Sequence, residues 1–211
     1  RPQAGRICLV CATKVPVWPS HWRDAGPNLY LLFSEYSSIA CYQWGWRMVM
    51  KHQYFGDTRD LFKYDLITRL VLDIPDLSRL IIIPMLTADD GSPGGGRTMF
   101  RESHAGYLNK VLTSFLAANR GSRDITRIVQ YFRDCGICMD MFGPPFLSHG
   151  REGYFSSAAT FCRGVQGALI FIDPDNGLEV KRSGEKHLLF SELLAVCTAA
   201  VPAPQIRKPP A

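Results

Sequence analysis

The chain has 211 residues, and its hydrophobic fraction of 46% supplies enough apolar material for one folded domain. Its 24 Lys and Arg residues exceed its 19 Asp and Glu residues by five, which permits an anionic partner but excludes a histone-like binder. No apolar run approaches the roughly 18 residues that a membrane-spanning helix needs. Composition therefore predicts a single globular domain that does not cross a membrane.

The number of cysteines indicates the redox state of the compartment in which the protein is expected. Seven cysteines, an odd number, exclude a framework in which every cysteine is paired. The apolar stretch 7–12 is too short for the core of a signal peptide, which needs about 7–15 residues. We therefore expect a reduced, cytoplasmic protein. Two C-x-x-C pairs, which begin at Cys8 and Cys135, make a shared zinc site an alternative. Compact zinc modules, however, space their pairs much more closely.

The two ends differ from the middle of the chain. All four tryptophans lie within the first 46 residues, where only the stretch from Tyr30 to Phe33 reads as a strand. Ordered patterns begin near Met50, and four prolines crowd the last eleven residues. We predict an atypical flank over 1–49, which is not part of the core domain, an α/β domain over 50–200 and a proline-rich tail over 201–211. A small independent module over 1–49 is the alternative.

The first core element is a predicted helix over 58–72. Asp57 is a favourable N-cap, Asp60 suits the first turn, and apolar residues recur at helical spacing as far as Val71. The dipeptide Ile74-Pro75 should end this helix. Residues 80–86 then form a continuous, isoleucine-rich run, which is typical of a strand buried on both faces.

A glycine-rich acidic loop at 87–97 precedes a predicted helix over 107–119. The apolar face of that helix would consist of five residues: Leu108, Val111, Leu112, Phe115 and Leu116. Residues 125–133 fit a strand or a short helix, and 134–153 read as a loop. A helix is expected over 155–163.

The second buried strand is predicted at 167–172, and a helix is predicted at 184–200. The alternation of strand, loop and helix predicts an α/β fold with a mainly parallel sheet. Ligands of such sheets bind beyond the carboxyl ends of the strands. Because both acidic loops follow strands, we expect them to converge on one site.

Candidate site residues gather in these loops. Asp173 and Asp175 follow the second strand, and carboxylates there can bind Mg²⁺ or accept from a substrate amine. The Asp-Pro-Asp-Asn-Gly sequence is also simply a good turn. In the first loop, Asp89 and Asp90 could accept from ribose hydroxyls, and Gly91 permits close backbone approach. The glycine-rich nucleotide-binding fingerprints are absent.

Three stretches resemble a known family: KHQYFGDTRDLFKYDLITRL at 51–70, MLTADDG at 85–91 and ALIFIDPDNGLEVK at 168–181. They resemble an uncharacterised family of bacterial and phage proteins that open with MKNQYFGD, and the likeness extends over about 50–195. Members of that family continue into further sheet after the second acidic loop. The resemblance therefore implies that the sheet of this chain is incomplete at the C-terminal end.

More distantly, the layout is similar to bacterial ribosomal-RNA adenine-N6 methyltransferases. Their Gly-Asn-x-x-Asp-x-x-Lys-His pattern is echoed by five residues: Gly56, Asp57, Asp60, Lys63 and Tyr64. Their Asp-Pro-Pro-Tyr motif falls on 173–176, where Asn176 replaces the stacking tyrosine.

This resemblance implies a Rossmann-like, methyltransferase-like fold that uses S-adenosylmethionine on nucleic acid. The substrate amine would meet Asp173, Asp175 and Asn176. The residues near the donor would be Asp89, Asp90, Gly91, Asp57 and Lys63.

Two other functions stay open. In a Mg²⁺-dependent nuclease or phosphoesterase, five acids would hold the metal: Asp89, Asp90, Asp173, Asp175 and Glu179. Lys181 would then offset phosphate charge. In the other alternative, the chain is a non-catalytic relative of methyltransferases that has lost its cofactor loop. The sequence leaves the oligomeric state open.

Overall fold

The computed structural model describes residues 7–11, 29–33, 55–87, 99–122, 124–174 and 176–200. Five strands form one open sheet in the order β2-β1-β5-β3-β4, and every neighbouring pair is parallel. The strands are β1 (Ile7–Cys11), β2 (Leu29–Phe33), β3 (Arg79–Pro84), β4 (Cys138–Met141) and β5 (Ala168–Asp173). The predicted α/β class with a mainly parallel sheet is confirmed.

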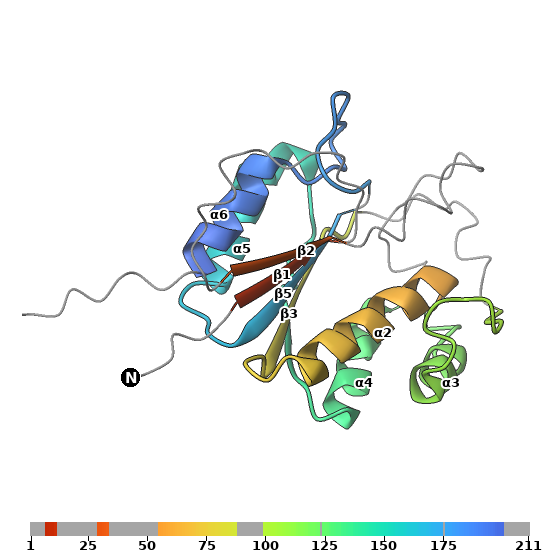
Figure 1. Ribbon diagram of the computed structural model, residues 1–211. Coiled ribbons are helices and arrows are strands. Elements are labelled where there is room, and N and C mark those ends of the chain that lie inside the picture. The colour runs from red at the N-terminus through yellow and green to blue at the C-terminus, as the bar shows by residue number, and fades with distance from the viewer. Residues whose placement is uncertain are drawn as a thin grey trace, which may run out of the picture.

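Helices cover both faces of the sheet (Figure 1). One face carries α2 (Thr58–Asp73), α3 (Lys110–Ala118) and α4 (Ile128–Asp134), and the other carries α5 (Arg151–Phe161) and α6 (Phe190–Ala200). Burial on both faces explains the continuous apolar runs of β3 and β5. Ile81 and Ile83 pack with α5 and α6, whereas Leu80 and Ile82 pack with α2, α3 and α4.

The position of α2 follows the local sequence. The Asp57 carboxylate accepts from the amides of Arg59 at 2.8 Å and Asp60 at 3.0 Å, so it caps the helix start as predicted. Ile74 is the C-cap, which confirms the predicted end. Among the described residues, no helix is long and apolar enough to cross a membrane.

The helix predicted at 107–119 begins later, at Lys110, because the side chain of Asn109 caps it by accepting from the Leu112 amide at 3.0 Å. Leu108 and Val111 are 81% and 66% exposed, so their predicted place on the buried face is wrong. Residues 125–133 are helical, with a 3₁₀ turn at Ile125–Arg127 that leads into α4.

The predicted loop at 134–153 contains β4 and a second 3₁₀ turn at Ser148–Gly150. Local sequence patterns do not reveal β4, because this edge strand has four residues, none fully buried, and no apolar run.

The last two helices start at other residues than predicted. Helix α5 begins at Arg151, which forms an ion pair with Glu192 of α6 and donates to the His187 carbonyl. Helix α6 begins at Phe190 because residues 184–189 form a return loop, in which Leu188 bridges to Leu178.

The predicted strand near Tyr30 is confirmed as part of β2. In the flank over 1–49, β1 pairs with β5 and with β2. The proposed division into flank, domain and tail stays a prediction, and the tail at 201–211 lies outside the described residues.

Candidate functional site

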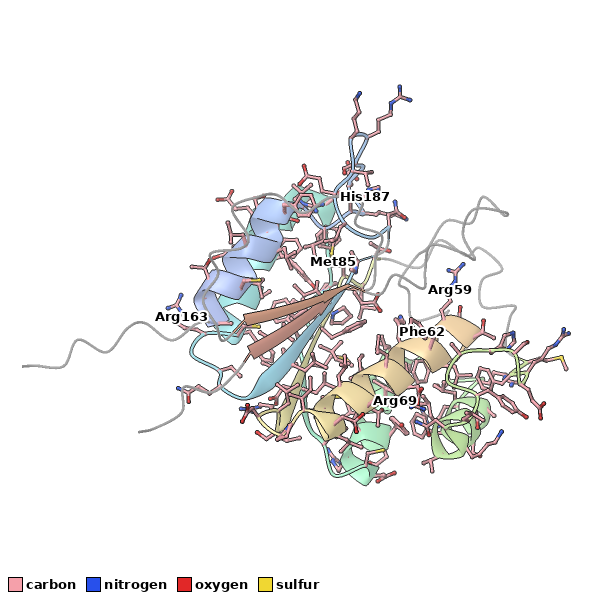
Figure 2. All side chains as sticks on the ribbon, viewed as in Figure 1. Arg59, Phe62, Arg69, Met85, Arg163 and His187 are labelled. Atoms are coloured by element: carbon pink, nitrogen blue, oxygen red, sulfur yellow. The ribbon has the colours of Figure 1, made fainter. Side chains whose placement is uncertain are left out.

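The carboxyl ends of β3 and β5 lie side by side. Pro84 and Asp173, the last residues of the two strands, are paired in the sheet register, and the Met85 amide donates to the Asp173 carbonyl at 3.1 Å. In Figure 2, Met85 lies at this end of the sheet, and Arg59 marks the first turn of α2. The two predicted loops therefore leave from neighbouring strands at the same edge.

A lysine from α2 joins two carboxylates at this edge. Lys63 Nζ lies 2.5 Å from Asp173 Oδ2 and 3.0 Å from Asp60 Oδ1. The second oxygen of Asp60 accepts from the Gly56 amide at 2.8 Å. We call Asp57, Asp60, Lys63, Tyr64 and Asp173 the strand-end cluster.

Burial makes these interactions strong. The side chains of Lys63, Asp60 and Asp173 are 12%, 7% and 9% exposed. A charge in such a place is costly unless a partner of opposite sign is close. One lysine with two acids gives local compensation and leaves the cluster net negative.

The protonation states follow from the same contacts. Burial opposes the charge of Lys63, but Asp173 and Asp60 more than offset it and hold its pKa well above the ordinary range. Burial raises the pKa of Asp173, against the influence of Lys63. Burial and the neighbouring Asp60 raise the pKa of Asp57 to about 6. Lys63 is therefore an ammonium ion at neutral pH.

Tyr64 completes the cluster. It is 1% exposed, and its ring lies 6.5 Å from that of Phe55 and 6.0 Å from that of Phe132, measured between centroids. Among the described residues, its hydroxyl is the one enclosed side-chain polar atom without a hydrogen-bond partner. Burial, followed by Asp60, raises the pKa of Tyr64 well above its ordinary value, so the hydroxyl keeps its proton.

The structure brings together three of the predicted site residues, Asp57, Lys63 and Asp173. Asp60 and Tyr64 join them. Both residues belong to the pattern at 56–64 that resembles the methyltransferase motif. Helical spacing is a second signal that groups Asp60 with Lys63 and Tyr64, because residues three and four positions apart share a face of the helix.

The other predicted residues lie elsewhere or outside the described chain. Asn176 is exposed, and its amide donates to the Lys186 carbonyl at 3.0 Å. A Glu179 carboxylate oxygen accepts from the Phe190 amide at 2.9 Å, at the start of α6, and Lys181 is exposed. Figure 1 shows their loop, between β5 and α6, projecting at the top of the view. Four predicted residues lie outside the described ones: Asp89, Asp90, Gly91 and Asp175.

The strand order argues against a zinc site shared by the two C-x-x-C pairs. Cys8 and Cys11 belong to β1 and Cys138 to β4, with β5 and β3 between them. Three strand spacings amount to about 14 Å, which is too far for ligands that each lie about 2.3 Å from one metal ion.

Comparison with protein-family models, with curated proteins and with solved structures finds no match for this chain.

The strand-end cluster fits a cationic ligand. Its three carboxylates outnumber its single ammonium, and the described contacts of Asp57 use only Oδ1. Oδ2 of Asp57 could therefore accept from an ammonium group of a ligand. Among the described residues, no group of three His, Cys, Asp or Glu side chains could hold a metal ion. A Mg²⁺ site at this edge would need Asp89, Asp90 or Asp175.

Proposed function

We propose that the chain is an S-adenosylmethionine-dependent methyltransferase with a Rossmann-like fold that acts on an amino group in nucleic acid. One observation carries the proposal: the 2.5 Å contact between Lys63 and Asp173. It joins the two segments on which the methyltransferase resemblance rests, and 110 residues separate them in the sequence. Local helix and turn formation does not require this contact.

The arrangement of the sheet supports an active site at this edge. Parallel sheets with helices on both faces bind ligands beyond the carboxyl ends of their strands, and the strand-end cluster lies there. The order β2-β1-β5-β3-β4 departs from the doubly wound order 3-2-1-4-5-6, because the last strand in the chain is central. The proposal therefore depends on the cluster rather than on the topology.

In this proposal each residue of the site has a separate role. Asp173 accepts a hydrogen bond from the substrate amine, since its described ion pair uses Oδ2 and leaves Oδ1 for the ligand. Burial raises the pKa of Asp173, which makes its carboxylate a better acceptor for the proton that the amine loses. Lys63 orients this carboxylate, and Asp57 would hold the donor together with Asp89, Asp90 and Gly91. The donor supplies the methyl group when it is bound.

Calorimetric titration of the full chain with S-adenosylmethionine, and separately with Mg²⁺, tests the proposal. We expect micromolar donor affinity that falls about tenfold in Asp57→Ala, because a hydrogen bond between ions is lost. Asp140→Asn is the matched control, since Asp140 pairs with Arg79 at an exposed site on β4. Its donor affinity should equal that of the wild type.

Mg²⁺ binding without donor binding, lost in Asp173→Ala, would contradict the proposal in favour of a nuclease or phosphoesterase. If a folded chain binds neither, the methyltransferase proposal fails, and a non-catalytic relative remains.

A further inference from the structure

The hydroxyl of Tyr64 differs from those of the other buried tyrosines that the structure describes. The Tyr131 hydroxyl lies 3.0 Å from Asn109 Nδ2 and 3.1 Å from Thr68 Oγ1. The Tyr154 hydroxyl donates to the Pro84 carbonyl at 2.7 Å. The Tyr64 hydroxyl has no such partner. Because an enclosed, unpaired donor costs folding free energy, a phenylalanine would fold at least as well at this position.

Tyr64 lies beside the charged groups of the strand-end cluster. Lys63 Nζ is 5.7 Å from the centre of the Tyr64 ring and 2.5 Å from Asp173 Oδ2. The ring and the Asp173 carboxylate therefore flank the same ammonium group. The negative charges of Asp60, Asp173 and Asp57 add to the effect of burial on the pKa of Tyr64. At neutral pH the hydroxyl is a donor, whereas the ionised Asp173 carboxylate, which shares Lys63 with the Tyr64 ring, only accepts.

We propose that the Tyr64 hydroxyl donates a hydrogen bond to a ring nitrogen of the substrate base, next to the amine that donates to Asp173. This inference rests on the proposed function and names a residue that selects the substrate.

A donor beside an acceptor matches an amine adjacent to a ring nitrogen, as adenine presents them. Hypoxanthine replaces the amine with a carbonyl oxygen, which would face the Asp173 carboxylate. A site built for one hydrogen-bonding pattern discriminates strongly against the reversed pattern, because its own buried polar groups are then left unpaired.

Binding measurements on the full chain test this inference, with Tyr64→Phe and the matched variant Tyr131→Phe. The probes are two single-stranded oligonucleotides that differ only in one base, adenine or hypoxanthine, and S-adenosylhomocysteine as a separate probe. We expect the wild type to favour the adenine probe about tenfold or more. Tyr64→Phe should lose about fivefold to tenfold in affinity for that probe, with unchanged S-adenosylhomocysteine affinity and an undiminished melting temperature. Tyr131→Phe should keep the preference and melt at a lower temperature.

Several outcomes would overturn the inference. If Tyr64→Phe melts lower and keeps the preference for adenine, the hydroxyl has a structural partner such as a bound water. If only the affinity for S-adenosylhomocysteine falls, the hydroxyl serves the methyl donor. A wild type without a preference also contradicts the inference, even if donor binding stands. If donor binding fails while Tyr64→Phe abolishes the adenine preference, the inference holds and the proposed methyltransferase function fails.

Discussion

Helix α2 contributes to two buried clusters of polar side chains, which differ in how completely their atoms are hydrogen-bonded. The strand-end cluster lies where β3 and β5 end. The second group, which we call the helix network, consists of Asp65, Thr68, Asn109 and Tyr131 and joins α2 to α4 and to the start of α3. In it, Asn109 Nδ2 lies 3.0 Å from both Asp65 Oδ1 and the Tyr131 hydroxyl. Thr68 Oγ1 lies 2.6 Å from the Tyr64 carbonyl and 3.1 Å from the Tyr131 hydroxyl.

The two groups differ in how completely their atoms are paired. Both hydroxyls of the helix network have hydrogen-bond partners, which rigidifies the packing of the helices. The strand-end cluster keeps an enclosed, unpaired hydroxyl and has more carboxylates than cations. A buried polar group that folding leaves unpaired does not add to stability and calls for another explanation, which we propose is a ligand. Substitutions in the two groups and around them test this difference.

Lys63→Met should have the largest effect. It removes the shared partner of Asp60 and Asp173, and leaving buried carboxylates unpaired costs about 3–5 kcal/mol of unfolding free energy. Urea denaturation measures the loss. Lys110→Met is the control, because Lys110 is exposed and lies over the Tyr107 ring at 3.4 Å, so its loss should cost less than about 1 kcal/mol. Equal losses in the two variants would contradict the strength that we assign to the buried ion pair.

Gly106→Ala tests how closely the segment that precedes α3 packs against α2. Gly106 has a φ of +87°, and an added Cβ would lie 2.7 Å from the Leu61 carbonyl oxygen. We expect a loss of about 2–4 kcal/mol, because the left-handed backbone and the collision act together. Gly153→Ala in α5 meets nothing within 4 Å and should stabilise the protein by up to about 1 kcal/mol. Thermal melts that show no difference between the variants would refute the close approach.

Removing one tyrosine hydroxyl from each group compares their contributions to the unfolding free energy. Tyr131→Phe removes a partner from Asn109 and from Thr68 and should cost about 1–3 kcal/mol. Tyr64→Phe removes a hydroxyl without a partner and should leave the unfolding free energy within about 0.5 kcal/mol of the wild type, or raise it. Chemical denaturation of both variants under the same conditions decides. A larger loss in Tyr64→Phe would reverse the assignment.

Asp57→Asn should have a small, pH-dependent effect. The pKa of Asp57 is raised to about 6 in the folded chain, against an ordinary value of 3.8. The folded state therefore binds the proton more tightly, and this group adds stability as the pH falls from about 6 towards 4. Asparagine also caps helices, so at pH 7 the variant should be more stable by about 1 kcal/mol, and the gap should close in acid. Melting curves between pH 4 and 8 measure the gap, and a gap that widens in acid would contradict the raised pKa.

Local patterns predicted α2, β3 and β5, because each depends on burial and caps that are visible in a few residues. They missed β4, whose four residues form an edge strand held by pairing with β3. The three-residue spacing within α2 is enough to bring Lys63 beside Asp60, but the contact with Asp173 depends on which strand lies next to β3. Tyr64 falls on the apolar stripe of α2 between Leu61 and Ile67, which accounts for its burial. The lack of a partner for its hydroxyl depends on the whole tertiary arrangement, which no sequence pattern reports.

We propose that the strand-end cluster binds a ligand and that the helix network only holds helices together. NMR spectra of the full chain with ¹³C-labelled tyrosine rings test it most directly, with the eight tyrosines assigned by substitution. On addition of S-adenosylhomocysteine together with the adenine oligonucleotide, we expect a large shift of the Tyr64 resonance and an unchanged Tyr131 resonance. An unmoved Tyr64 resonance at saturating ligand, or equal shifts of both tyrosines, would contradict it.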